Sequence, residues 1–132
     1  MCANIPSNRE SGLQFLQQGK YAESIPYLVM AVGEQSTDID LAIYLAYAYS
    51  QIGDMDNALE VLERAADIFP TSAKIHYNLG VAYQRAHNST QAKDEYLRAL
   101  GLDAKYVPAK TALDNLYHVD ANASSVSIPP TV

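Results

Sequence analysis

Residues 41–52 read LAIYLAYAYSQI, and together with Gly53 they form a run of thirteen residues without a charge. Asp40 and Asp54 bracket this run. An amphipathic surface helix carries one apolar stripe, but here apolar side chains fall on every face of a helix. The run is also shorter than the roughly 20 residues that a membrane-spanning helix needs. It therefore predicts either a helix buried on all sides or a helix that keeps one apolar face for a partner.

The same pattern returns later in the chain, at a constant spacing and without a gap. Six pairs of equivalent residues share this spacing: Leu45 and Leu79, Ala46 and Gly80, Tyr49 and Tyr83, Ala58 and Ala92, Leu62 and Tyr96, and Ala65 and Ala99. Small residues recur at the same places in both copies, which is expected where two helices cross closely. The chain therefore contains an internal repeat, and we call the constant spacing its repeat period.

The bulk composition fits one globular domain, with 132 residues of which 48% are hydrophobic and 18% charged. A net charge of −6 argues against a nucleic-acid partner, because the phosphates would be repelled. The charges are uneven, however. Residues 34–67 hold eight acidic side chains against Arg64 alone, whereas residues 74–110 hold six basic against three acidic. This asymmetry could steer a partner, although solvated helix faces explain most such runs.

The number of cysteines and the length of the apolar segments indicate where in the cell the protein is located. Cys2 is the only cysteine, so no intramolecular disulfide is possible. The segment after it is polar, and no apolar stretch of secretory or membrane-spanning length is found. We therefore expect no signal peptide, no membrane association and a cytoplasmic location.

Helix signals divide the chain into seven helices and no strand. Ser7 and Glu10 form a capping box before the first helix, which ends at Gly19. Apolar residues spaced three or four apart predict a second helix over about 21–32, which Pro26 bends slightly without breaking it. The other predicted helices lie at 41–52, 55–69, about 73–86, about 89–102 and 107–118. Residues 1–6 are predicted to form a flexible lead-in, and the small and polar residues 119–132 a disordered tail.

A repeat period of about 34 residues, built from helix, tight turn and helix, resembles that of the tetratricopeptide repeat family. Three copies fit the numbering 5–38, 39–72 and 73–106, and the helix at 107–118 resembles the family's capping helix. Residues that match the family pattern in the third copy are His76, Leu79, Gly80, Tyr83, Ala92, Tyr96 and Ala99. The first copy is degenerate, with Asn8, Ser11, Ser24 and Ser36 at positions that are usually apolar or proline. The resemblance implies an all-α fold, a right-handed superhelix of three repeats over residues 7–118.

In this family the first helix of each repeat lines a concave groove. The residues that the resemblance places there are Arg9, Leu13 and Leu16, then Ile43, Tyr44 and Tyr47, and finally Lys74, Tyr77, Asn78 and Val81, with Arg85 beside them. The functional interpretation is an aromatic and aliphatic groove for a peptide, in which Arg9, Lys74 and Arg85 hold carboxylates. The alternative is that neighbouring helices, or the tail, already cover these residues.

Some family members grip the acidic tails of chaperones with five polar residues. At the matching positions, Arg9 and Lys74 carry the expected charge. Leu13, Tyr44 and Asn78 stand where asparagine, asparagine and arginine belong. Two matches of five do not make such a clamp, so this ligand is not expected.

The sequence offers little for catalysis or for metal binding. His76 occupies a packing position, and His87 and His118 are not spaced with it as metal ligands are. The glycines are scattered over turns and helix crossings and form no phosphate-binding loop. We therefore expect no enzyme activity and no cofactor.

Two functions of different classes remain. The first is a scaffold or adaptor module that binds a peptide segment of a partner protein. The second is a structural protein that forms a homodimer or a larger assembly by burying its groove or its repeat ends. Polar residues on the end elements, such as Ser11 and Lys110, argue against end-to-end stacking.

Overall fold

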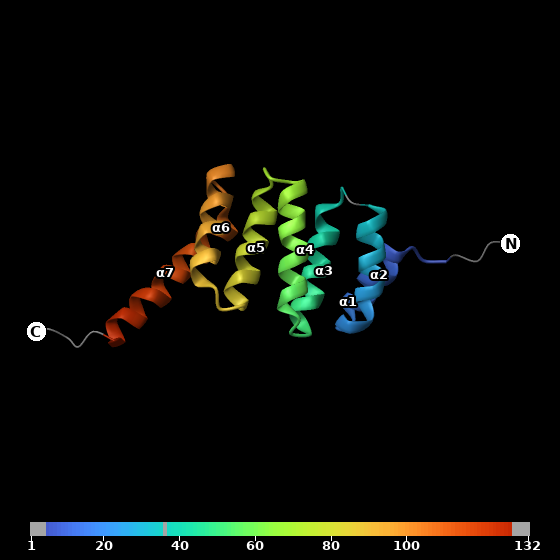
Figure 1. Ribbon diagram of the computed structural model, residues 1–132, viewed down its shortest axis with the longest axis horizontal. Helices are drawn as coiled ribbons and strands as arrows, with labels where there is room; N and C mark the ends of the chain where they lie inside the picture. Colours follow the sequence, from blue (N-terminus) through green and yellow to red (C-terminus); the bar gives the residue numbers. More distant parts are fainter. Residues whose placement is uncertain (1–4, 36, 128–132) are drawn as a thin grey trace, which may run out of the picture. The chain divides into compact units, whose positions relative to one another are not determined.

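The structure, a computed structural model, describes residues 5–35 and 37–127, and the side-chain surroundings as far as residue 117. The described residues form seven α-helices that pack in sequential pairs, so the predicted all-α class is confirmed (Figure 1). The chain divides into two compact units, Met1–Pro70 and Thr71–Val132. Each unit has its own hydrophobic core.

The helix bounds follow the repeat. The first unit contains α1 (Asn8–Gln17), α2 (Tyr21–Glu34), α3 (Ile39–Gln51) and α4 (Met55–Ile68). The second contains α5 (Ala73–Arg85), α6 (Ser89–Leu102) and α7 (Val107–Ser127). Helices α2, α4 and α6 begin and end one repeat period apart, and so do α3 and α5. The repeat inferred from side-chain identities is therefore also a repeat of helix ends.

Polar side chains set where four helices begin. Each of these residues accepts a hydrogen bond from a backbone N–H of the first turn: Ser7, Asp38, Asp54 and Ser72. Such caps satisfy donors that have no partner within the helix and contribute about 1 kcal/mol each. The Ser7 cap also explains why α1 begins at Asn8, three residues after the position that the period alone would give.

The turn within each repeat has the same backbone form. Gly19, Gly53 and His87, again one repeat period apart, have φ values of 74°, 84° and 65°. In each case the N–H of this residue donates to the carbonyl three residues back, and the next N–H donates to the carbonyl five residues before it. This is the Schellman arrangement, in which a left-handed residue ends the helix. In the third repeat that residue is a histidine, so its side chain strains the turn.

His87→Gly is expected to stabilise the chain by up to about 1 kcal/mol. Relief of the left-handed strain, roughly 1–2 kcal/mol, outweighs the added backbone entropy of the unfolded glycine, roughly 0.5–1 kcal/mol. Urea denaturation followed by circular dichroism measures the change. Gly53→Ala is the matched control and should destabilise, because φ there is 84°. A His87→Gly variant less stable than the unsubstituted chain would contradict the strained turn.

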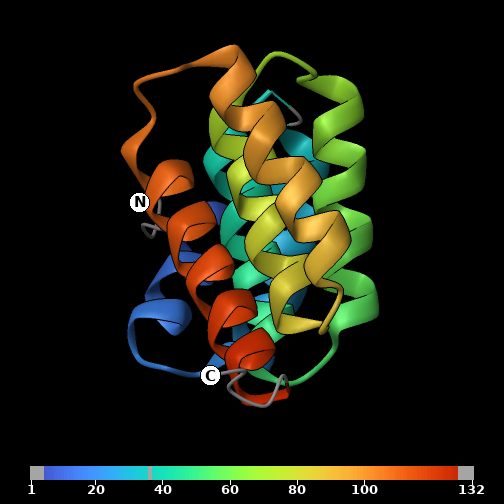
Figure 2. The ribbon, with the colours of Figure 1, turned by 90° about the vertical axis from the view of Figure 1, so that its left-hand side faces the viewer.

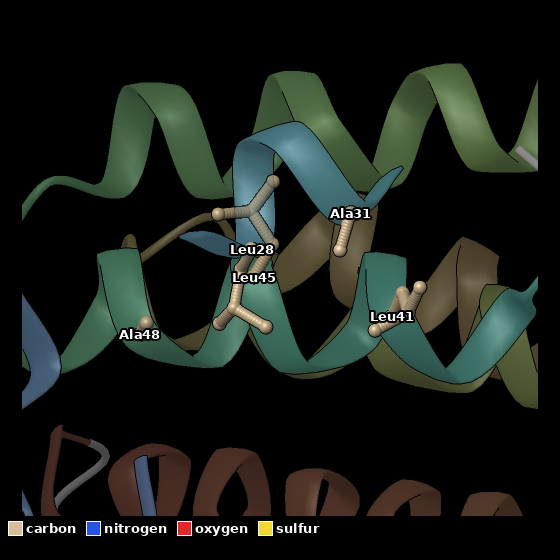
Figure 3. Close-up of a cluster of buried hydrophobic side chains, with 5 residues drawn as sticks. All are labelled: Leu28, Ala31, Leu41, Leu45 and Ala48. Carbon is tan, nitrogen blue, oxygen red and sulfur yellow. The ribbon is translucent and has the colours of Figure 1, made fainter. Parts of the chain in front are cut away.

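The core of the first unit lies between α2 and α3. Five buried residues form it: Leu28, Ala31, Leu41, Leu45 and Ala48. Figure 3 shows Leu28 and Ala31 of α2 facing Leu41 and Leu45 of α3. The uncharged stretch 41–52 is therefore buried along much of α3, because α2 and α4 both pack against it.

The core of the second unit joins α6 to α7, which pack against each other (Figure 2). Ala92 and Tyr96 of α6 meet Leu113 and Leu116 of α7, and half-buried residues of α5 cover them. Lys93 lies over the ring of Tyr117, with Nζ 4.5 Å from its centroid. This cation–π contact adds a second attachment of α7 to α6.

The last helix is longer than the sequence predicted, and a few residues at each end of the chain are not described. Helix α7 continues through residues 119–127, beyond the predicted end at 118 and into the stretch predicted to be disordered. The physical reason is that no glycine or proline occurs between Pro108 and Pro129. Residues 128–132 of the predicted tail, and residues 1–4 of the predicted lead-in, lie outside the described residues. Helix α2 runs unbroken through Pro26, as predicted.

Candidate functional site

One pocket of the second unit contains three of the residues predicted to line a groove. Tyr77, Val81 and Arg85 lie four residues apart on α5, and hence on one face of the helix. They line a pocket of about 440 Å³. The other lining residues are Gln84, Tyr96, Ala112 and Asn115. Three of the predicted groove residues therefore lie together in one pocket, and their role in binding a peptide stays a prediction.

Tyrosine rings form the inner wall of this pocket. The ring centroid of Tyr77 is 5.9 Å from that of Tyr96 and 5.7 Å from that of Tyr106. Tyr96 is buried, and its hydroxyl donates a 2.7 Å hydrogen bond to Oε1 of Gln84. Burial, with a smaller contribution from Tyr77, raises the pKa of Tyr96 to about 12. The Tyr96 ring is therefore neutral at pH 7, and packing and the Gln84 hydrogen bond hold it in place.

The buried polar groups near this wall have partners. Nδ1 of His76 lies 3.0 Å from Oε2 of Glu95, and Glu95 also accepts a 2.9 Å hydrogen bond from Arg98. His76 thus occupies a packed position, as its place in the repeat indicated.

Lys74 and Asn78 do not line the pocket. Asn78 is half-buried, and its side-chain amide donates a 2.8 Å hydrogen bond to the backbone carbonyl of Lys74. The Lys74 side chain is exposed. Asn78 therefore supports the first turns of α5, and its assignment to a peptide-binding groove stays a prediction.

In the first unit, several predicted groove residues serve the fold. Leu13 and Tyr44 are half-buried and pack against the core cluster. Nε of Arg9 lies 3.4 Å from Oδ2 of Asp38, the residue that caps α3. Arg9 therefore already has an acidic partner within its own unit.

Tyr47 is the most open aromatic residue of the predicted set. Its side chain is 41% exposed, whereas Ile43 beside it is half-buried. The Tyr47 ring meets the ring of Tyr21 edge-on, with centroids 5.7 Å apart. The pKa of Tyr21 is raised, first through its side-chain hydrogen bond with Tyr47. The Tyr21–Tyr47 pair therefore presents an oriented aromatic surface.

Sequence reasoning missed the α7 side of the pocket. Ala112 and Asn115 lie one repeat period after Asn78 and Val81, which were both predicted groove residues. Extending the repeat phase onto the last helix would have found them. The prediction treated that helix only as a cap.

Metal and membrane features can be judged only where the structure describes the chain. Among the side chains that the structure describes, no three His, Cys, Asp or Glu gather closely enough to hold a metal ion. In the same part of the chain, no helix combines the length and apolar character needed to cross a membrane. The cytoplasmic location stays a prediction.

Comparison with known families agrees with the helix pairs. A family model described as a TPR repeat matches residues 46–86, and one described as a tetratricopeptide repeat matches residues 73–106. The chain belongs to the tetratricopeptide repeat (TPR) family. Its seven helices are consistent with three repeats and a capping helix.

Curated relatives match over short segments of much larger proteins. The rhomboid protease GluP of Bacillus subtilis (strain 168) is 35% identical over 83 residues, which cover 59% of this chain and 16% of GluP. The human antiviral innate immune response effector IFIT1 is 32% identical over 72 residues, which cover 54% of this chain and 15% of IFIT1. The chain thus spans about a sixth of the length of these relatives.

Solved structures of TPR domains share the fold. The Sgt2 TPR domain from Aspergillus fumigatus has a TM-score of 0.80 at 20% identity, covering 95% of this chain and 84% of that one. The first TPR of Spaghetti (RPAP3), bound to the HSP90 peptide SRMEEVD, has a TM-score of 0.75 at 23% identity, covering 86% and 90%. The second TPR domain of human RPAP3, in complex with the HSP70 peptide SGPTIEEVD, has a TM-score of 0.74 at 22% identity, covering 84% of this chain and 92% of that one.

Proposed function

We propose that this TPR domain binds a peptide segment of a partner protein and acts as a scaffold or adaptor. The observation that carries the proposal is the α5–α7 pocket, which combines Tyr77, Val81 and Arg85 on one face of a helix. Aromatic, aliphatic and cationic groups together are typical of surfaces that recognise peptides. Tyr47 and Ile43 supply a second apolar patch on α3.

The pocket fits one apolar side chain of a peptide. Its volume of about 440 Å³ is within the usual range of small-ligand pockets, roughly 300–1,000 Å³. The fixed rings of Tyr77 and Tyr96 supply contact area without losing much side-chain entropy on binding. The exposed Arg85 at the same pocket favours an acidic residue next to the inserted side chain.

The structural relatives support the class of ligand. The two RPAP3 domains are described with chaperone peptides, SRMEEVD and SGPTIEEVD, which both end in acidic residues. In this chain Arg9 is paired with Asp38, and Leu13 and Tyr44 pack on a core. We therefore propose a ligand that is held mainly by apolar anchors, and we expect SRMEEVD to compete weakly with it.

Arg85→Glu is expected to weaken binding of a selected peptide by at least about tenfold, which corresponds to about 1.4 kcal/mol. The probe is a dye-labelled peptide selected on the intact chain from a displayed random library, and fluorescence anisotropy gives its affinity. Arg85 is exposed, so the variant should retain the helix content of the unsubstituted chain.

Lys105→Glu is the matched control for charge, because Lys105 is exposed in the connection before α7 and does not line the pocket. It should leave the affinity unchanged. Equal affinities for Arg85→Glu and Lys105→Glu would show that the selected peptide binds elsewhere and would contradict the proposed site. Light scattering decides against the alternative, self-assembly, if the chain has the mass of a monomer.

A further inference from the structure

Helix α2 presents an exposed apolar surface. Met30 is 58% exposed and Val29 44%, and three further exposed residues of this surface are Ala22, Pro26 and Gly33. Residues 22, 26, 29 and 33 follow one another at spacings of four, three and four, so they form a single stripe along the helix. No charged residue interrupts this α2 stripe.

The second repeat carries charges where this stripe is apolar. The residues of α4 that lie one repeat period after those of the α2 surface are, in order, Asp56, Glu60, Glu63, Arg64 and Asp67. All five are charged and exposed. The same structural position in the second repeat is thus occupied by residues suited to water. An apolar version of this face in the first repeat has no explanation in the packing of its own core.

A cleft lies directly beside the stripe. It has a volume of about 380 Å³, and α2, α3 and α4 all contribute to its lining. Figure 1 shows α2 and α4 on either side of α3. The apolar lining residues are Val29, Val32, Ala42, Leu45, Tyr49, Val61, Ala65, Ile68 and Phe69. Ile68 is 58% exposed at the α4 rim. The cleft and the α2 stripe together form a continuous apolar surface.

An acidic stripe of α4 runs beside the cleft. Asp56, Glu60, Glu63 and Asp67 are spaced by four, three and four residues and form one stripe along α4, and Glu60 lines the cleft. Arg64 also lines the cleft and pairs with Glu60 at 3.5 Å, but it is one cation among these carboxylates. The first unit as a whole holds ten acidic side chains against three basic ones. Its field therefore favours a cationic partner and disfavours a second copy of the same unit.

We propose that the α2–α4 cleft docks a basic amphipathic helix of a partner protein. Its apolar side chains enter the cleft over Val29 and Ile68, and its lysines or arginines lie along the acidic stripe of α4. This is the helix-in-groove mode of recognition. This cleft belongs to the first unit, whereas the pocket of the proposed peptide site lies on α5, α6 and α7 of the second. The two sites can therefore be tested independently.

The test measures two dye-labelled helical peptides by fluorescence anisotropy on the intact chain. Both carry leucines on one face, and they differ only in lysine or glutamate on the flanks. The lysine peptide should bind more tightly by at least about tenfold, and its affinity should fall as salt is raised. The double variant Val29→Glu, Met30→Arg places the residues of the second repeat in the first. It should lower the affinity for the lysine peptide by at least about tenfold.

Leu97→Glu is the matched control, because Leu97 occupies the equivalent position of the third repeat and is also exposed. It should leave the affinity of the lysine peptide unchanged. Circular dichroism verifies that the double variant keeps its helix content, which is expected for two exposed positions. The double variant Glu63→Lys, Asp67→Lys should lower the affinity for the lysine peptide and leave the apolar cleft intact.

Three results would overturn the proposal. The first is equal affinity for the two peptides, or no measurable binding of the lysine peptide. The second is unchanged binding by the Val29→Glu, Met30→Arg variant. The third is a dimer in light scattering that this double variant converts to a monomer, because a second copy would then be the occupant of the cleft.

Discussion

Leu45→Ala is expected to lower the free energy of unfolding by about 2–5 kcal/mol. Leu45 is 3% exposed and lies in the centre of the first core, where it faces Leu28 across the α2–α3 contact (Figure 3). Two other members of that cluster, Ala31 and Ala48, are too short to fill the space that the truncation leaves. The lost burial and the remaining cavity therefore act together.

Urea denaturation followed by circular dichroism measures this change, and Leu97→Ala is the control. Leu97 is the same residue type on a helix of the same fold, but it is 45% exposed, so its truncation should cost less than about 1 kcal/mol. Equal losses for the two leucines would mean that the α2–α3 contact is not a packed core.

Gly80→Leu is expected to destabilise the chain by about 1–3 kcal/mol through overpacking. A Cβ atom at Gly80 would lie 2.6 Å from Cε1 and 2.7 Å from Cδ1 of Tyr96, and 3.2 Å from the carbonyl oxygen of Ala92. The Tyr96 ring cannot move aside easily, because it is buried and its hydroxyl is held by Gln84. The leucine must therefore push α5 away from α6.

Thermal unfolding tests this prediction against a second helical glycine. A Cβ atom at Gly101 would meet nothing within 4 Å, so Gly101→Leu should be neutral or slightly stabilising. Asp56→Ala, on the exposed face of α4, should also stay within about 0.5 kcal/mol. A Gly80→Leu variant as stable as these two would contradict the close crossing of α5 and α6.

Much of the fold could be predicted because its signals are local. Caps such as Ser7 and Asp38, and breakers such as Gly53, act within one turn of the residue that carries them. The repeat then placed small residues such as Gly80 at helix crossings. The apparent defects of the first repeat were harder to judge. Ser24 is fully buried, and its hydroxyl donates to the carbonyl of Tyr21 at 2.7 Å, so it is accommodated without an apolar side chain.

The candidate site was less predictable because helical phase gives the direction of a side chain and not its neighbours. Tyr77 was predicted to lie open in a groove, but Tyr106, from the connection before α7, packs against its ring. Leu13 and Tyr44 have the phase of groove residues and still contact the first core. Long-range contacts of this kind depend on how far each helix is shifted along its neighbour, which no local pattern records.

Within each unit, the helices pack on those nearest to them along the chain: α1 on α2, α2 on α3 and α3 on α4, then α5 on α6 and α6 on α7. Such short separations keep the entropic cost of closing each loop small, and they are typical of chains that fold quickly. They also remove any need to wait for the C-terminus. During synthesis, the α2–α3 core has all its residues as soon as Ala48 has left the ribosome, so structure can accumulate from the N-terminus while the later helices are still being made.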